Sequence, residues 1–307
     1  MQQPALLFLT DWDGTITEHD TLSLVAPTDT QVQDGKNTFA YYENMYQETM
    51  SKFKDDYGPI DSENTLREYI GDVLKAEKIT LNKIIEDGLF QGIRGDELRS
   101  RVSQVAFRPG WDQIQAWICA HTPCDCVHAY IISINWSRQF IHEALLLNTK
   151  EKQGVDCNTT GFEGILANEV EECTGICTGR IVGPNGAPPL LTGIDKLNIF
   201  RDIRSQYVKE PITLYLGDSV PDLLCLLEAD VAIIMGNNPS LLKALDDSGL
   251  SLCMRTIANL RDVVQHGNLP DQTMLVRTNT WCQVMEIITV LTDNIDALCT
   301  LRAKRRT

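Results

Sequence analysis

The sequence is short of basic residues and of long hydrophobic runs. Of its 307 residues, 27 are Lys or Arg and 42 are Asp or Glu, which gives a formal net charge of -15. A surface of this sign repels the phosphates of nucleic acids and of anionic lipids, so neither is expected as a partner. No apolar run approaches the ~20 residues that a membrane-spanning helix needs, so no membrane span is expected.

Neither end of the chain carries a clear targeting signal. Residues 1–15 (MQQPALLFLTDWDGT) have no basic segment, and their apolar stretch runs directly into acidic residues. That pattern indicates a buried strand and not a signal peptide, so we expect a cytoplasmic protein. The other end carries a basic tail, which we interpret as solvated, while a targeting or docking role stays open. Its members are Arg302, Lys304, Arg305 and Arg306.

The ten cysteines are scattered along the chain. In a cytoplasmic protein of this length we expect free thiols and no disulfide framework. Two closer pairs, Cys124 with Cys126 and Cys173 with Cys177, together offer four thiolates, which leaves a zinc site open. Neither pair has the two-residue gap of the usual zinc motifs, so buried or incidental thiols are the expected role.

Short apolar runs, each ending at a small or polar residue, recur along the chain. They lie at 5–10, 127–134, 212–217 and 230–235. Segments with helical periodicity lie between them, at 137–147, 195–206 and 220–228. This repeated order of strand, polar loop and helix predicts an α/β fold with a doubly wound, Rossmann-like parallel sheet. Ligands of such sheets bind at the carboxyl ends of the strands, where the polar residues that end these runs would lie.

Residues 17–108 interrupt this alternation. They are rich in charge and show no buried-strand run, and their helical periodicity lies at 36–57, 64–77, 80–90 and 95–105. We therefore expect a helical insertion over 17–108 within a core made of residues 1–16 and 109–307. The Arg108-Pro109-Gly110 sequence punctuates the return to the core.

Two later segments are interpreted more coarsely. Residues 154–193 are rich in Gly and Pro and contain a strand-like piece at 162–167, which predicts a small antiparallel excursion. After about residue 250 we expect one strand-like piece at 250–254 and a final helix at 281–303.

The motif Asp11-Trp12-Asp13-Gly14-Thr15 directly follows the first apolar run. Two carboxylates one residue apart can face one pocket, where one attacks phosphorus and the other handles the leaving-group proton. Their mutual repulsion calls for a cation, and hard carboxylate oxygens favour Mg²⁺. Gly14 permits a tight turn, and Thr15 offers a hydroxyl and an N–H to phosphate oxygens. The alternative is an acidic turn that caps the next element.

A second polar segment follows the next apolar run. Ser133 ends that run, and Ile134, Asn135 and Ser137 follow it. Its hydroxyl and the backbone N–H groups can cradle a phosphate. The alternative is a helix N-cap, which suits Ser137 better than Ser133.

Two further pieces complete the set of polar sites. Lys196 opens a helical segment in TGIDKL, where its charge would neutralise a phosphate, although a lone lysine is ordinarily a surface residue. Asp218, Ser219 and Asp222 belong to the sequence GDSVPD after the run 212–217, and such acids suit metal ligation. The alternative is a turn with a helix start, which is compatible with metal binding.

These four pieces, in this order, resemble the signature of the haloacid dehalogenase superfamily. The helical insertion after the first motif resembles the type-1 cap of the phosphoserine-phosphatase-like branch. Ile165-Leu166-Ala167-Asn168-Glu169 and TGIDKL are also similar to that branch. The resemblance implies a Rossmann-like core with an inserted α-helical cap, a Mg²⁺ cofactor and hydrolysis of a small phosphomonoester.

The resemblance also implies roles for the acidic residues. Asp11 would form an aspartyl-phosphate, and Asp13 would protonate the leaving group and then activate water. Asp11, the backbone carbonyl of Asp13 and Asp218 would ligate Mg²⁺, with Ser219 and Asp222 in support, Asp222 either of the metal shell or of Lys196. A second acid at position 13 is similar to the phosphatases and absent from the dehalogenases.

Further roles follow from the same resemblance. Ser133 and Lys196 would hold the transferred phosphoryl group, together with the loop at Ile134 and Asn135. Asp20 lies nine residues after Asp11, where phosphoserine phosphatases place an acid that meets the substrate amine. Here the acid is Asp and not Glu, so strict phosphoserine specificity does not follow, and a capping role for Asp20 stays open.

The sequence therefore predicts a Mg²⁺-dependent phosphomonoesterase that acts on a small phosphorylated metabolite. One alternative is a catalytically weak relative that binds a phosphorylated ligand as a sensor or partner. Another is transfer of phosphate to an acceptor other than water. The identity of the substrate and the oligomeric state stay open.

Overall fold

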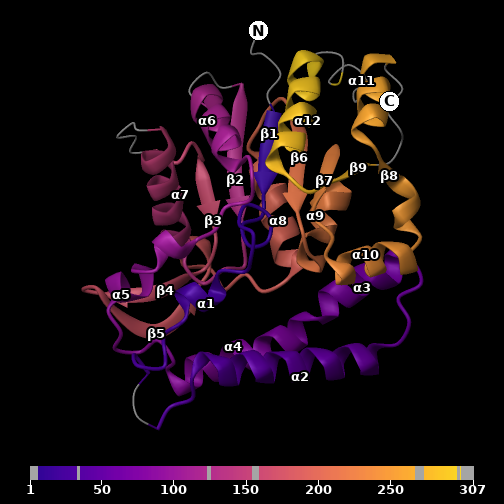
Figure 1. The fold of residues 1–307 in the computed structure, drawn as a ribbon. Helices are drawn as coiled ribbons and strands as arrows, with labels where there is room; N and C mark the ends of the chain where they lie inside the picture. The colour runs from indigo at the N-terminus through magenta and orange to yellow at the C-terminus, as the bar shows by residue number, and fades with distance from the viewer. Residues whose placement is uncertain are drawn as a thin grey trace.

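A parallel sheet forms the centre of the protein. The computed structural model describes residues 6–32, 35–122, 126–153, 159–266, 273–295 and 298. Seven strands lie in the order β3-β2-β1-β6-β7-β9-β8 (Figure 1). They are β1 (Leu6–Thr10), β2 (Val127–Ile132), β3 (Gly164–Leu166), β6 (Ile212–Gly217), β7 (Val231–Met235), β8 (Met254–Arg255) and β9 (Met274–Thr278). The order runs outward from β1 through β2 and β3 on one side and through β6 and β7 on the other, and the predicted doubly wound α/β fold is confirmed.

Strand β1 lies at the point where the strand order reverses. It pairs in parallel with β2 on one side and with β6 on the other, so the three strands end at the same edge of the sheet. All its residues are buried. Leu6 and Phe8 face one helical layer, as the alternation of side chains along a strand requires. Leu7 and Leu9 face the other layer. Burial on both faces explains why the sequence of this strand is a continuous apolar run.

Helices cover both faces of the sheet (Figure 1). One face carries α6 (Trp111–His121), α7 (Arg138–Gln153), α11 (Ile257–His266) and α12 (Trp281–Asp293). The other carries α8 (Gly193–Ser205), α9 (Leu223–Glu228) and α10 (Pro239–Asp247). Trp111 and Trp281 join α6 to α12, with ring centroids 4.8 Å apart. Phe200 and Tyr215 join α8 to β6 on the opposite face, with ring centroids 6.1 Å apart.

The segment between β1 and α6 is helical wherever the structure describes its regular elements. It contains α1 (Leu22–Val25), α2 (Phe39–Tyr57), α3 (Glu63–Asp72), α4 (Leu74–Asp87), α5 (Gly95–Arg99) and a 3₁₀ turn (Val102–Gln104). Thr17 and Phe107 form an isolated bridge where this segment leaves and rejoins the core. Helices α2 and α4 lie below the sheet in Figure 1, across the edge at which β1 and β6 end.

The boundary between α3 and α4 differs from the sequence expectation. The break lies at Val73, not between residues 77 and 80. The two helices bury different faces: Leu66 of α3 packs on the core layer that holds Leu7, whereas Ile84 of α4 packs within the insertion. The chain therefore changes direction where its apolar face changes partner, and helical periodicity alone does not locate that change.

The segment after α7 also divides differently from expectation. Its strand-like piece at 162–167 contains β3, which pairs in parallel with β2 at the edge of the main sheet. The antiparallel excursion is the hairpin of β4 (Glu169–Cys173) and β5 (Ile176–Val182). Val170 and Ile181 of this hairpin pack against the helical insertion. A 3₁₀ turn (Pro184–Gly186) follows the hairpin.

The last part of the chain is richer in structure than the sequence indicated. The piece at 250–254 is mostly a 3₁₀ turn (Leu250–Cys253), and β8 begins at its end. Strand β9 and helices α10 and α11 were not expected, nor was α6 earlier in the chain, because short or mixed apolar runs do not distinguish a strand or helix from a loop. Helix α12 begins at the predicted residue. The tail formed by Arg302, Lys304, Arg305 and Arg306 lies outside the described residues.

The cysteines do not form a zinc site of four thiolates. Cys126 is in a disulfide bond, contrary to the expectation of free thiols, so its sulfur is not a thiolate. Cys173 and Cys177 are free, and Cys124 lies outside the described residues. In the ranges that the structure describes, no helix is both long and apolar enough to cross a membrane.

Candidate active site

Asp11 and Lys196 meet at the carboxyl end of β1. The backbone N–H of Asp11 donates to the carbonyl of Leu216 in β6 (2.9 Å), which fixes the start of the loop. Lys196 Nζ donates to Asp11 Oδ1 (2.7 Å) and to Asp222 Oδ1 (2.7 Å). Lys196 comes from a distant part of the sequence and is 1% exposed. Asp11 therefore has one oxygen held by a buried cation and the other left for further contacts.

Helix α8 presents Lys196 from its first turn. The Thr192 hydroxyl caps the helix by accepting from the backbone N–H of Asp195, and the Asp195 carboxylate accepts from the backbone N–H of Thr192. Burial alone would lower the pKa of Lys196, but the charges of Asp11 and Asp222 outweigh it and hold the pKa above its usual value. The lysine is therefore a permanent cation in this pocket.

Asp222 organises the loop that follows β6. Its Oδ1 accepts from Lys196 and from the Tyr215 hydroxyl (3.0 Å). Its Oδ2 accepts from the backbone N–H groups of Asp218 (3.3 Å) and Ser219 (3.2 Å), and from the Ser219 hydroxyl (2.9 Å). Both oxygens are filled by donors, so Asp222 holds the loop and the lysine in place and is not free to ligate a metal.

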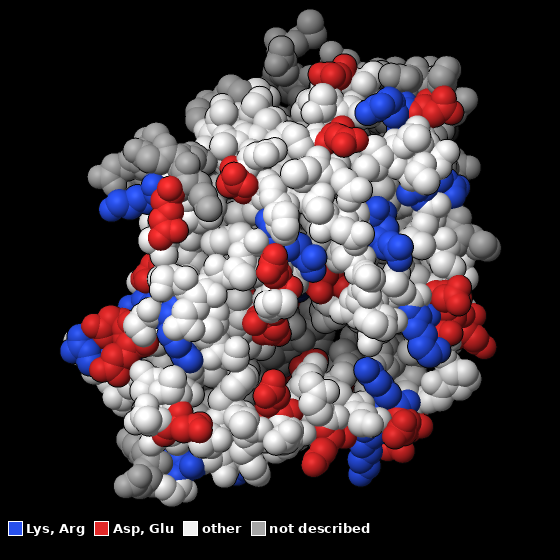
Figure 2. All heavy atoms as spheres, in the orientation of Figure 1, with Lys and Arg blue, Asp and Glu red and all other residues white. Residues whose placement is uncertain are grey.

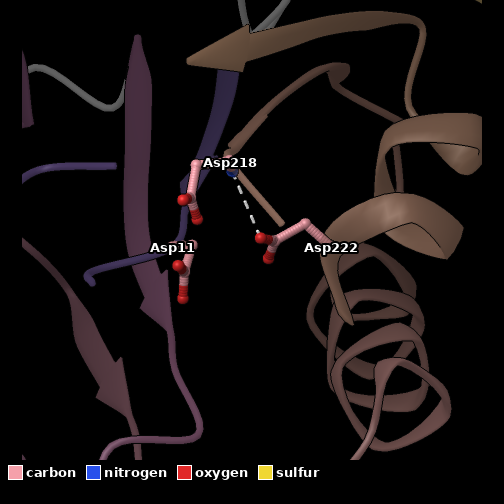
Figure 3. Close-up of side chains that lie close together, drawn as sticks. All are labelled: Asp11, Asp218 and Asp222. Atoms are coloured by element: carbon pink, nitrogen blue, oxygen red, sulfur yellow. Dashed lines mark hydrogen bonds between the residues drawn. The ribbon is translucent and has the colours of Figure 1, made fainter. Parts of the chain in front are cut away.

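Three carboxylates gather at this edge of the sheet. Asp11, Asp218 and Asp222 can each offer an oxygen so that all three lie within 4.8 Å of one another (Figure 3). Burial raises the pKa of Asp218 to about 7, and the charge of Asp222 adds to the effect. Burial and Asp222 also raise the pKa of Asp11 against the opposing charge of Lys196. The negative charges of these carboxylates repel one another, and a divalent cation between Asp11 and Asp218 would offset that repulsion. A set of carboxylate oxygens suits Mg²⁺.

Gly14 makes room for this acidic cluster. A Cβ atom at Gly14 would lie 2.4 Å from Asp218 Oδ2, and the glycine has φ +68, which side chains rarely adopt. Arg108 Nε donates to the Gly14 carbonyl (2.8 Å) and holds the turn from outside. The first motif and the loop after β6 therefore approach each other at a position where only glycine fits.

Asp13 is held between the insertion and the second motif. Its Oδ1 accepts from the Thr21 backbone N–H (2.7 Å) and hydroxyl (2.6 Å), and its Oδ2 accepts from Asn135 Nδ2 (2.9 Å). Burial raises the pKa of Asp13 to about 7, and the nearby charge of Asp20 contributes. Asp13 is therefore an oriented carboxyl group that can carry or accept a proton near neutral pH.

The polar segment after β2 lies beside Asp13. Ser133 is buried, its N–H donates to Leu166 (3.0 Å), and its hydroxyl accepts from the Asn135 N–H (3.1 Å). The Ile134 carbonyl accepts from Asn168 Nδ2 (3.0 Å). In this arrangement the Asn135 side chain orients Asp13, and the Ser133 hydroxyl hydrogen stays available to a ligand. The buried hydroxyl of Thr15 has no hydrogen-bond partner among the described residues.

The chain is similar to three curated proteins at 22–24% identity. No family model matches the chain. A CTO1 family protein of Schizosaccharomyces pombe is 22% identical over 291 residues, which cover 92% of this chain and 98% of that protein. Cold tolerance protein 1 of Saccharomyces cerevisiae is 23% identical and covers 76% of this chain and 79% of its own length. The mitochondrial bifunctional TH2 protein of Arabidopsis thaliana is 24% identical over 80% of this chain and 42% of its own length.

Solved structures with a similar fold include phosphatases. A substrate-bound phosphoserine phosphatase covers 80% of this chain and 91% of its own length, at 15% identity and a TM-score of 0.43. A hydrolase of the haloacid dehalogenase family from Salmonella enterica serovar Typhi covers 78% of this chain and 65% of its own length, at 16% identity and a TM-score of 0.46. In this chain, the reversal of strand order at β1 gathers all four motifs at one edge. The parallel sheet with a helical segment inserted after β1 is the Rossmann-like α/β fold that the sequence predicted.

Asp20 lies close enough to Asp13 for its charge to help raise the pKa of Asp13. Its side chain is exposed, and its Oδ1 accepts from the Leu22 backbone N–H (2.7 Å) at the start of α1. Partial desolvation by the surrounding protein raises the pKa of Asp20, and the charge of Glu43 in α2 adds to the effect. This contact at the start of α1 is the one that the capping alternative expected.

Several residues of the site were missed in the sequence. Thr21 positions Asp13, and Tyr215 supports Asp222 from within β6. Neither belongs to a recognisable pattern. Arg108 was assigned only a punctuating role, yet its charge lowers the pKa of Asp218 against the larger effect of burial. A lone arginine next to Pro-Gly carries no sign that it faces an acidic cluster.

Proposed function

We propose that the protein is a Mg²⁺-dependent phosphomonoesterase that acts on a small phosphorylated metabolite through a phosphorylated Asp11. The observation that carries this proposal is the pairing of Asp11 with the buried Lys196, beside an Asp13 whose pKa is about 7. A nucleophilic carboxylate, a fixed cation and an oriented acid are the groups that phosphoryl transfer requires. Residues 17–108 would serve as the cap that covers the reaction.

The first half of the reaction would use Asp11 and Asp13. Asp11 Oδ2, the oxygen that Lys196 does not hold, attacks phosphorus, and the bond from phosphorus to the ester oxygen breaks. Asp13 gives its proton to the departing oxygen, so the product is a neutral alcohol. Lys196 stays bonded to Oδ1 and opposes the negative charge that collects on the phosphoryl oxygens.

The second half would return the enzyme to its starting state. Asp13, now ionised, takes a proton from water as the water oxygen attacks phosphorus, and the bond from phosphorus to Asp11 breaks. Thr21 and Asn135 keep the Asp13 carboxylate in place through both steps. Mg²⁺ held by Asp11 and Asp218 would neutralise phosphate charge in both halves.

The test of this proposal is phosphate release from a panel of small phosphomonoesters. With Mg²⁺, we expect the wild-type protein to release phosphate from at least one ester, and we expect chelator to stop it. Asp11→Asn keeps an oxygen for Lys196 but is a poor nucleophile, so its rate should fall to background. Normal turnover by this variant would contradict the covalent role of Asp11. If the folded wild-type protein releases phosphate from none of the esters, the result would favour a protein that binds a phosphorylated ligand without hydrolysing it.

A further inference from the structure

A cavity of about 200 Å³ lies between the insertion and the core, next to the proposed reaction site. Its core side includes Gly193 and Ser219. Gly193 begins the helix that carries Lys196, and Ser219 follows Asp218 in the chain. The cavity therefore adjoins the two segments that would hold the phosphoryl group and the metal. Figure 2 shows a hollow on this face of the molecule, with acidic side chains along its rim.

The insertion side of the cavity combines aromatic rings with a carboxylate. Tyr46 of α2, Tyr69 of α3 and Glu77 of α4 all line it. The Tyr46 hydroxyl donates to Glu77 Oε1 (3.0 Å), and Phe53 packs on Tyr69 with ring centroids 5.6 Å apart. Three helices thus bring two phenol rings and one acidic group to this side of the pocket, together with other lining side chains.

Glu77 has no cationic partner among the described residues. Lys54 also lines the cavity, but it is not paired with Glu77. The Cα of Lys54 lies two turns from that of Tyr46, about 12 Å along the axis of α2 at 1.5 Å per residue. Desolvation raises the pKa of Glu77 to about 7, and only the Tyr46 hydroxyl opposes this effect. The charge of Asp20 acts on Tyr46 and that of Glu43 acts on Asp20, so two more carboxylates lie near this side of the cavity. A half-buried carboxylate without a cation is costly, unless a ligand supplies the cation.

We propose that the pocket of Tyr46, Tyr69 and Glu77 holds the leaving group of the substrate and selects one with a positively charged nitrogen. This inference rests on the proposed phosphomonoesterase activity. Glu77 supplies the countercharge, while the two phenol rings offer faces to which an organic cation is attracted. The phosphoryl group of the same molecule lies toward Lys196, so Tyr46, Tyr69 and Glu77 are specificity residues and not catalytic ones.

Matched pairs of esters test the charge preference. Choline phosphate and 3,3-dimethylbutyl phosphate have the same shape and differ in one positive charge. The same holds for (1-methylpyridinium-3-yl)methyl phosphate and 3-methylbenzyl phosphate. With Mg²⁺, we expect the wild-type kcat/KM to favour the cationic member of at least one pair by about tenfold, the scale of a desolvated cation–π contact with a countercharge. Equal values within both pairs would overturn the inference.

Variants then assign the preference to the pocket. Glu77→Gln should lower kcat/KM for the cationic ester about tenfold and leave that for the neutral ester nearly unchanged. Glu86→Gln makes the same change of charge at an exposed position of α4 and should keep the preference. Tyr46→Phe removes the bond to Glu77 but keeps the ring, and it should keep most of the preference. A preference that survives Glu77→Gln in full contradicts the role of Glu77.

The inference and the proposed activity can fail separately. If no ester is hydrolysed, the proposed activity fails, and binding of the same esters is measured by thermal unfolding of the Mg²⁺-loaded protein. The cationic ester of a pair should still raise the unfolding midpoint more than its neutral partner. Equal shifts in the wild-type protein, or a difference unchanged in Glu77→Gln, would overturn the inference independently of turnover.

Discussion

Lys196 is the residue on which the acidic site depends most. It is the cation shared by Asp11 and Asp222, and all three side chains are buried. A buried ion pair that loses one partner leaves an uncompensated charge, which is far more damaging than loss of an exposed pair. The same lysine therefore serves folding and the proposed chemistry.

Lys196→Met should lower the free energy of unfolding of the Mg²⁺-free protein by about 3–5 kcal/mol and abolish phosphate release. Urea unfolding at neutral pH measures the first effect. Lys243→Met is the matched control, because Lys243 is exposed and pairs with Asp247 on the surface of α10. It should change stability little. A similar small change for both variants would mean that the buried pairing contributes nothing to folding.

Some residues of the site were predictable, and others were not. Local signals in the sequence pointed to the first motif, Ser133 and the acids after β6, because each lies at or directly after the end of an apolar run. Lys196 was found in the same way, because it lies in the first turn of a capped helix. Thr21 and Tyr215 act only through contacts that form when distant segments meet. No local pattern distinguishes this threonine or this tyrosine from the others in the chain, because the partner of each is set by the fold.

At the scale of elements, buried strands were located best. The runs at 5–10, 212–217 and 230–235 match β1, β6 and β7 to within a residue, since burial on both faces demands continuous apolar sequence. Strand β9 was missed because its apolar part is only Met274 to Val276. The break between α3 and α4 was misplaced because each helix packs against a different partner.

The turn between β1 and α1 gives a prediction at this scale. Gly14→Ala should disrupt the metal site, because its Cβ would meet Asp218 and its backbone has φ +68. Gly249→Ala is the control: it has φ +74 and nothing within 4 Å of the added atom. Both variants carry a backbone cost of about 1 kcal/mol, but only Gly14→Ala should lose Mg²⁺ binding, measured by calorimetry. Equal Mg²⁺ affinity in the two variants would contradict the close approach.

At the scale of the whole molecule, the acidic site should couple stability to pH and, through the proposed Mg²⁺, to metal. In the Mg²⁺-free protein, Asp218 has a pKa of about 7 against about 4 in an unfolded chain, and that of Asp11 is raised as well. Between these values the folded state holds protons that the unfolded chain has lost, so stability falls as pH rises from about 4 to about 7. Mg²⁺, if it is bound by the ionised carboxylates as proposed, should reverse this loss.

Saturating Mg²⁺ should therefore raise the unfolding temperature more at pH 8 than at pH 5.5, where protons compete with the ion. Differential scanning calorimetry with Mg²⁺ and with chelator measures both shifts. Asp218→Asn removes one ligand and should reduce the shift at pH 8. A shift that is the same at both pH values would show that the ion does not bind at these carboxylates.

The most direct test of the central claim needs no knowledge of the substrate. Beryllofluoride binds to a carboxylate as a mimic of the phosphoryl group on an aspartyl-phosphate, and fluorine NMR detects the bound form. We expect bound fluorine signals from the wild-type protein with Mg²⁺, and none with chelator or in Asp11→Asn. Absence of bound signals from the folded, Mg²⁺-loaded wild-type protein, or their persistence in Asp11→Asn, would contradict a phosphorylated Asp11.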